Sequence, residues 1–129
     1  MTTDEIRTAF KGKLVGNIDM KKYVTLVLSK MPENIISFVT ENVWFVTSFD
    51  DAWAFTFTGN DFLNKHVVFL SDDLFQQDFA QISWTIAHEI GHVVLGHKNR
   101  FSEKFSKERV TMQEEEADAF AEKYFTPSN

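Results

Sequence analysis

The sequence predicts an α+β fold on three observations. Apolar residues recur at helical spacing in the first and last thirds of the chain, whereas the middle is rich in β-branched and aromatic residues. Hydrophobic residues make up 43% and charged residues 25% of the 129 residues, a composition typical of globular proteins. We find no repeat, low-complexity tract or Pro/Gly-rich linker, so we predict a single domain over residues 1–129.

Three helices are predicted in the N-terminal third. Thr3 is placed to cap the first helix and Asp19 the second. Pro32 fits the first turn of the third helix, which runs through Val39.

Three strands are predicted in the middle of the chain. Val43–Thr47 and His66–Leu70 are β-branched and aromatic runs, and Trp53–Thr58 alternates aromatic and small residues. Gly59–Asp61 is a turn signal between the last two strands. Three strands at this spacing predict a small, mostly antiparallel, three-stranded sheet.

Helices return in the last third. A short helix is predicted from Asp72 or Asp73 through Phe79, and a final one over about Thr111–Tyr124. Between them, a long helix over roughly Gln81–Gly96 is apolar on most of its circumference. Such a helix is central and buried on several sides.

Composition and charge exclude several kinds of site. The chain has no cysteine, so any metal site must use histidine and carboxylate ligands. The net charge of -6 does not indicate direct binding to nucleic acid. Met1–Lys13 lacks the apolar stretch of a signal peptide, and no apolar run is long enough to span a membrane. We therefore expect a cytoplasmic protein without a membrane anchor.

The segment His88-Glu89-Ile90-Gly91-His92 carries the strongest functional signal. On a helix, residues i and i+4 share a face, so both imidazoles can bind one zinc ion with Glu89 beside it as general base. Gly91 leaves room for another backbone or a substrate to approach. The alternative is a histidine pair satisfied by hydrogen bonds in the core. That alternative is disfavoured because burying Glu89 without a cation is costly.

A zinc enzyme needs a third protein ligand and an open position for water. The candidates are carboxylates, His66 and His97. Glu114 and Asp118 stand at i and i+4 of the final helix, so one can bind the metal while the other accepts the ring N–H of a ligand histidine. The alternative is a solvated acidic helix start, which also suits the helix dipole.

Small residues indicate which side of the final helix packs inward. Ala117 and Ala121 share a face with Glu114 and allow close helix packing. Glu115 lies about 100° and Glu116 about 200° around the helix from Glu114. If either of these replaces Glu114 as ligand, the helix phase is different from the one predicted here.

The two motifs together resemble the ImmA/IrrE family of small zinc metallopeptidases. The resemblance rests on His88–His92, on the Glu-x-x-Ala-Asp pattern of Glu114–Ala121 and on the lead-in Trp84–Ala87, and it covers roughly residues 66–127. Tyr124–Pro127 stands where the family often has a Leu-Leu-Met-Pro-like ending.

The resemblance implies a zincin-like minimal domain of the gluzincin kind. Its central helix would carry His88 and His92 as zinc ligands and Glu89 as catalytic base, and its C-terminal helix Glu114 as third ligand. A metallo-endopeptidase acting on a protein or peptide is expected, and a transcriptional repressor is the substrate that the resemblance suggests. Two other functions stay open: a zinc-binding regulatory or interaction module with little turnover, and a metal-free structural protein.

Other residues and segments are candidates for oxyanion stabilisation and substrate binding, and each also has a purely structural explanation. His97, Tyr124 and His66 are candidates for stabilising an oxyanion, and each can equally be a packing, capping or surface residue. The strand Val67–Leu70 is either an edge that pairs with an extended substrate or an internal strand. The basic stretch Lys98–Arg109 is either a solvated connection or a cleft wall that attracts an acidic substrate.

Overall fold

The computed structural model describes residues 1–48, 54–58, 65–96 and 107–126, and it confirms the α+β class. Helices occupy both ends of the chain and strands its middle, as predicted. The elements in chain order are α1 (Thr3–Ala9), β1 (Leu14–Val15), α2 (Ile18–Ser29), α3 (Glu33–Asn42), β2 (Val43–Ser48), β3 (Ala54–Thr58), β4 (His66–Ser71), the 3-10 helix η2 (Asp72–Gln76), α4 (Phe79–Val94) and α5 (Lys107–Glu122).

The caps of the first two helices lie one and two residues before the predicted ones. Thr2, not Thr3, caps α1: its Oγ1 accepts a hydrogen bond from the Glu5 backbone N–H at 3.1 Å, and the Glu5 carboxylate accepts one from the Thr2 N–H at 2.9 Å. Asn17, not Asp19, caps α2, where its Oδ1 accepts from the Met20 N–H at 2.8 Å. Each shift has the same reason: several neighbouring residues can cap a helix, and the residue types alone do not tell which of them takes the cap position.

The predicted mostly antiparallel, three-stranded sheet is wrong in strand number and direction. The described strands form a four-stranded sheet in the order β1-β2-β4-β3. β1 and β4 both run parallel to β2, and only β3 is antiparallel, to β4. Strand periodicity identifies the segments but not their partners: β4 takes the place beside β2, and β3 lies beyond it. The two-residue β1 is too short for any periodic signal.

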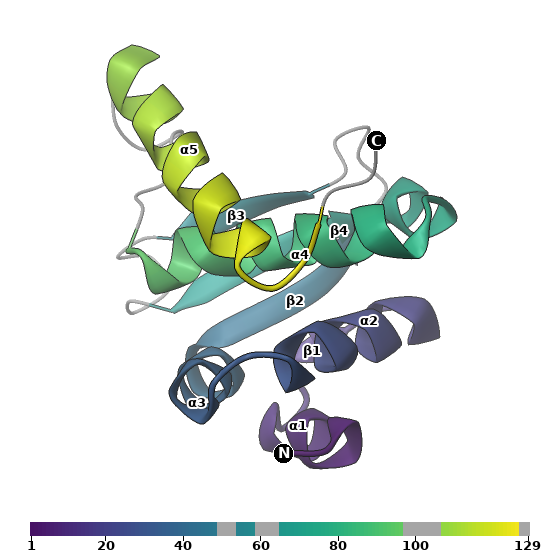
Figure 1. Ribbon diagram of the computed structural model, residues 1–129. Helices are drawn as coiled ribbons and strands as arrows, with labels where there is room; N and C mark the ends of the chain where they lie inside the picture. Colours follow the sequence, from purple (N-terminus) through teal and green to yellow (C-terminus); the bar gives the residue numbers. More distant parts are fainter. Residues whose placement is uncertain (49–53, 59–64, 97–106, 127–129) are drawn as a thin grey trace.

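α4 crosses one face of the sheet, and α5 packs against α4 (Figure 1). Inward side chains of β2 and β4, among them Phe45 and Leu70, meet α4 through Ile86 and Ile90 in one hydrophobic cluster. Phe10, which follows α1, contacts Phe45 edge-on at 5.8 Å between ring centroids. Burial of these apolar side chains is the main stabilising contribution and fixes α4 across the sheet.

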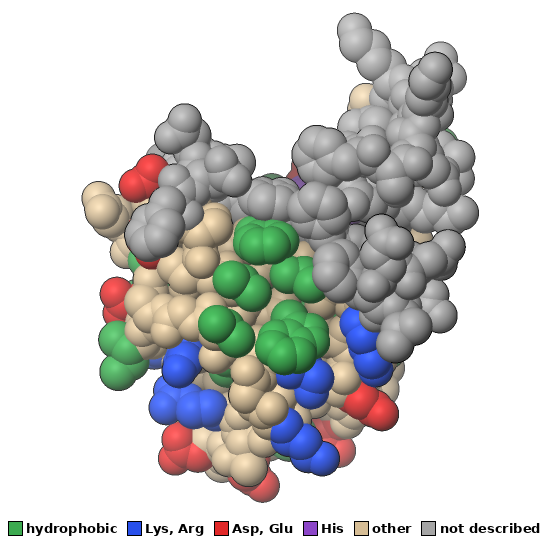
Figure 2. Space-filling view, turned by 180° about the vertical axis from the view of Figure 1, so that it is seen from behind, with side chains coloured by type: hydrophobic (Ala, Val, Ile, Leu, Met, Phe, Trp, Pro, Cys, Tyr) green, Lys and Arg blue, Asp and Glu red, His purple; other side chains and the backbone are tan. Residues whose placement is uncertain are grey.

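The opposite face of the sheet is partly exposed to solvent. Figure 2 shows hydrophobic side chains gathered there, and alternate residues of β2 and β4 account for them, since Trp44 is 41% exposed and Val67 and Phe69 are partly exposed. β4 lies between β2 and β3, so of the two alternatives for Val67–Leu70 the internal strand is the one that the described sheet supports. Among the described helices, none is long and apolar enough to cross a membrane.

Candidate metal centre

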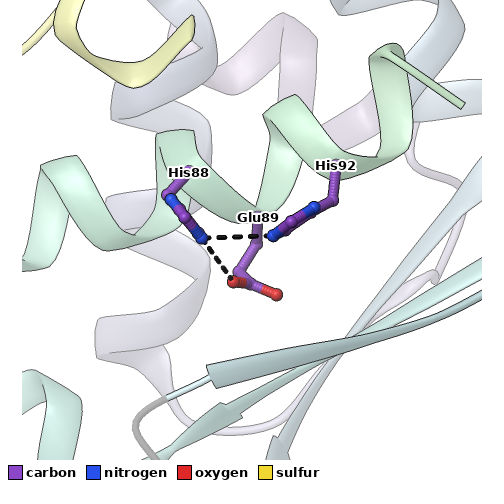
Figure 3. Close-up of side chains that lie close together, drawn as sticks. All are labelled: His88, Glu89 and His92. Atoms are coloured by element: carbon purple, nitrogen blue, oxygen red, sulfur yellow. Dashed lines mark hydrogen bonds and ion pairs between the residues drawn. The ribbon is translucent and has the colours of Figure 1, made fainter. Parts of the chain in front are cut away.

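α4 places the His-Glu-x-x-His motif inside the molecule. The helix starts after Asp78, whose Oδ1 accepts from the Gln81 N–H at 2.8 Å, and it buries His88 and Glu89 to 8% and 6% exposure. His88 and His92 project from successive turns with Glu89 between them (Figure 3). The Nε2 atoms of the two imidazoles are 3.2 Å apart, and Glu89 Oε2 is 3.8 Å from His88 Nε2.

α5 brings two carboxylates to the same imidazoles. Glu114 bridges them, with Oε2 at 3.0 Å from His88 Nε2 and Oε1 at 3.3 Å from His92 Nε2. Asp118 Oδ1 lies 2.8 Å from the other ring nitrogen, His88 Nδ1. This second contact has the distance of an ion pair but not the angle of a hydrogen bond. Glu114 therefore meets both histidines at their Nε2 atoms, and Asp118 lies at the other ring nitrogen of His88.

Close packing of α4 and α5 explains why these carboxylates reach the histidines. Gly91 is the contact point: a Cβ at that position would lie 3.0–3.2 Å from three atoms of Phe120. The space beside Gly91, which we expected to admit a backbone or a substrate, is therefore occupied by the Phe120 ring. Ala117 and Ala121 are fully buried in the same seam, whereas Glu115 and Glu116 are exposed.

Neighbouring groups shift the pKa values of Glu114 and His88. Hydrogen bonds from His88 and then His92 hold the pKa of Glu114 well below its usual range, so this carboxylate is ionised at neutral pH. Burial lowers the pKa of His88, but the hydrogen bond to Glu114 and the charges of Glu89, Glu114 and Asp118 outweigh it, and the net pKa is raised. Three carboxylates facing two imidazoles make a surrounding that favours a cation.

The donor atoms fit a zinc ion in kind and in spacing. Zinc binds imidazole nitrogen and carboxylate oxygen with bonds of about 2.0–2.1 Å, which at tetrahedral angles puts ligand atoms roughly 3.3 Å apart. The separations of 3.0, 3.2 and 3.3 Å among the His88, His92 and Glu114 atoms agree with that value. Glu89 also lies within a 4.8 Å group with the two histidines. Its 3.8 Å from His88 Nε2 is longer, so the distances favour Glu114 as the third donor.

The remaining candidates have other surroundings. His66 is buried at the start of β4 with its ring 6.1 Å from that of Phe38 in α3, and burial lowers its pKa. Tyr124 meets Phe120 edge-on at 5.5 Å and packs against the core. His97 and residues 98–106 of the basic stretch lie outside the described residues, as do the side chains of 107–109.

Trp84 makes a contact with His88 that was not predicted from the sequence. Its indole stacks on the His88 imidazole, with 5.2 Å between ring centroids and 30° between ring planes. The available signal was an aromatic residue four positions before a ligand histidine, which places both on one helix face.

A family model described as Peptidase U49 matches residues 64–129, just over half of the chain. The chain belongs to the Peptidase U49 family. The matched segment of this U49 peptidase contains α4 and α5, and with them all five predicted site residues. Membership confirms a peptidase, and so a hydrolase, in general terms; it does not single out the ImmA/IrrE family. No curated protein and no solved structure is similar enough to count as a match.

Proposed function

We propose that this U49-family chain is a zinc-dependent endopeptidase whose metal is held by His88, His92 and Glu114. The observation that carries the proposal is the bridging carboxylate. Glu114 comes from a separate helix and lies within 3.3 Å of the Nε2 atoms of both histidines. Three donors from two packed helices form a site that folding assembles, and this is the ligand set of a catalytic zinc with one open position.

Zinc bound there supplies a Lewis acid and brings the pKa of a water molecule to about 7. Glu89 acts as general base: it accepts a proton from the attacking water and delivers it to the nitrogen of the leaving amine. The water oxygen forms a new bond to the carbonyl carbon, and the C–N bond breaks. Glu89 is only 6% exposed, so little water screens its electrostatic interactions with the metal ion and the reacting groups, and these interactions are stronger for it.

Asp118 sets the tautomer of the first ligand. A carboxylate beside Nδ1 of His88 favours the tautomer that carries its proton there and leaves the Nε2 lone pair for the metal. Its side chain is 45% exposed, so it acts from the solvent side of the cluster.

The substrate is proposed to be a polypeptide bound in extended form along β3. β3 is the last strand in the order of the described sheet and lies beside α4 (Figure 1). An edge strand offers backbone N–H and C=O groups to an extended peptide. A repressor-type regulatory protein stays the substrate that the ImmA/IrrE resemblance predicts.

Removal of the metal tests this function. Incubation with a strong chelator is expected to reduce hydrolysis of unfolded casein to background, and one equivalent of Zn²⁺ is expected to restore it. Mg²⁺ should not restore it, because that ion prefers six oxygen ligands. Hydrolysis that persists in protein shown to be metal-free would contradict zinc dependence. One bound zinc without turnover of casein or of any protein partner would favour the zinc-binding regulatory module.

A further inference from the structure

The imidazole of His88 is contacted on its face as well as at its nitrogens. Its two nitrogens lie against Glu114 and Asp118, 3.0 and 2.8 Å away. The edge-on ring of His92 is 4.7 Å from it, at 86° between planes. The indole of Trp84 stacks on it, with 5.2 Å between ring centroids and 30° between ring planes. Among the described residues, Trp84 therefore makes the one stacked ring contact with His88.

The helix itself brings Trp84 to this place. Side chains of an α-helix lean toward its N-terminus, so the His88 ring lies over the preceding turn, where Trp84 stands at i−4. The outer torsion of a histidine side chain has broad minima and does not by itself fix the ring plane. Asp118 is a weak restraint because its side chain is 45% exposed and its contact is not aligned as a hydrogen bond.

We infer that Trp84 is a positioning residue that fixes the plane of His88, so that its Nε2 faces the Nε2 of His92 and Glu114. This role rests on the metal site proposed above. The buried indole N–H has no hydrogen-bond partner among the described residues, so Trp84 acts through its ring and not through a polar contact. A phenyl ring at the same position keeps a planar face against His88, whereas an aliphatic side chain does not.

The test compares Trp84→Phe with Trp84→Leu in the full chain. Zinc dissociation constants are measured by competition with a fluorescent chelator, the visible spectrum of the Co²⁺-loaded protein reports ligand geometry, and thermal unfolding of the metal-free protein reports packing. Trp44→Leu on the outer sheet face is the control for the same substitution elsewhere. The Phe variant should bind zinc within about 3-fold of the wild type, and the Leu variant roughly 10-fold more weakly with altered Co²⁺ bands, the loss typical of groups that orient a ligand.

Three results would overturn the inference, and they are distinguishable. Equal zinc affinity and identical Co²⁺ spectra in wild type, Phe and Leu variants would exclude a positioning role. Losses of affinity in both variants that follow their melting temperatures would assign Trp84 to packing alone. A wild-type chain that binds no zinc would overturn the proposed function, and this inference with it.

Discussion

Glu89→Gln is expected to lower the rate of peptide hydrolysis by roughly 100- to 10,000-fold, the usual contribution of a general base. The amide has the size of the carboxylate but cannot accept the proton of the attacking water. Zinc should stay bound, because Glu89 is 3.8 Å from His88 Nε2 and the bridging carboxylate is Glu114. The two quantities to measure are the hydrolytic rate and the zinc content of the same preparation.

Glu115→Gln is the matched control for that substitution. It removes the same charge from an exposed position on α5, so rate and zinc content should both stay near the wild-type values. Loss of zinc in Glu89→Gln would make Glu89 a ligand and reverse the roles proposed for the two glutamates.

Glu114→Ala is expected to weaken zinc binding by on the order of 100-fold or more. The free energy of zinc binding in small proteins, divided over four ligands, amounts to roughly 3 kcal/mol per ligand. Glu114 lies within 3.3 Å of both ligand histidines, and no other carboxylate in the described residues is shown bridging them. Zinc titration with a competing chelator measures the loss directly.

Substitutions of three other acidic residues on α5 provide the comparison for Glu114→Ala. Glu115→Ala and Glu116→Ala change exposed side chains of the same helix, and their affinities should stay within about 2-fold of the wild type because no ligand is removed. Asp118→Asn should weaken zinc binding roughly 10-fold, since Asp118 favours the His88 tautomer that carries its proton on Nδ1 and does not itself donate to the metal. A larger loss at Glu115 or Glu116 than at Glu114 would assign the third ligand to another face of α5.

The fold was predictable in its segments and not in its pairing. Helical spacing and β-branched runs identify α2, α4 and β2 because each is long enough to show its period. The parallel order β1-β2-β4 depends on contacts between residues far apart in sequence, such as Phe45 with Val68, and local pattern carries no information on them. β1, with only Leu14 and Val15, has no period to detect.

The placement of the candidate site residues was more predictable than the sheet because helix geometry is local. The i and i+4 spacing of His88 with His92, and of Glu114 with Asp118, fixes each pair on one helix face before any tertiary contact is known. Which of Glu114–Glu116 turns inward followed from the small residues Ala117 and Ala121, both buried against α4. The contact of Phe120 with Gly91 was not predictable, since it depends on how the two helices cross.

The most direct test is anomalous diffraction at the zinc edge from crystals of the zinc-loaded chain. The expected result is one strong anomalous peak per chain, bonded at about 2.0–2.1 Å to Nε2 of His88, Nε2 of His92 and a carboxylate oxygen of Glu114, with Glu89 not coordinated. A peak bound to Glu89 in place of Glu114, or well-ordered crystals grown with zinc that show no peak between the two histidines, would contradict the proposed centre.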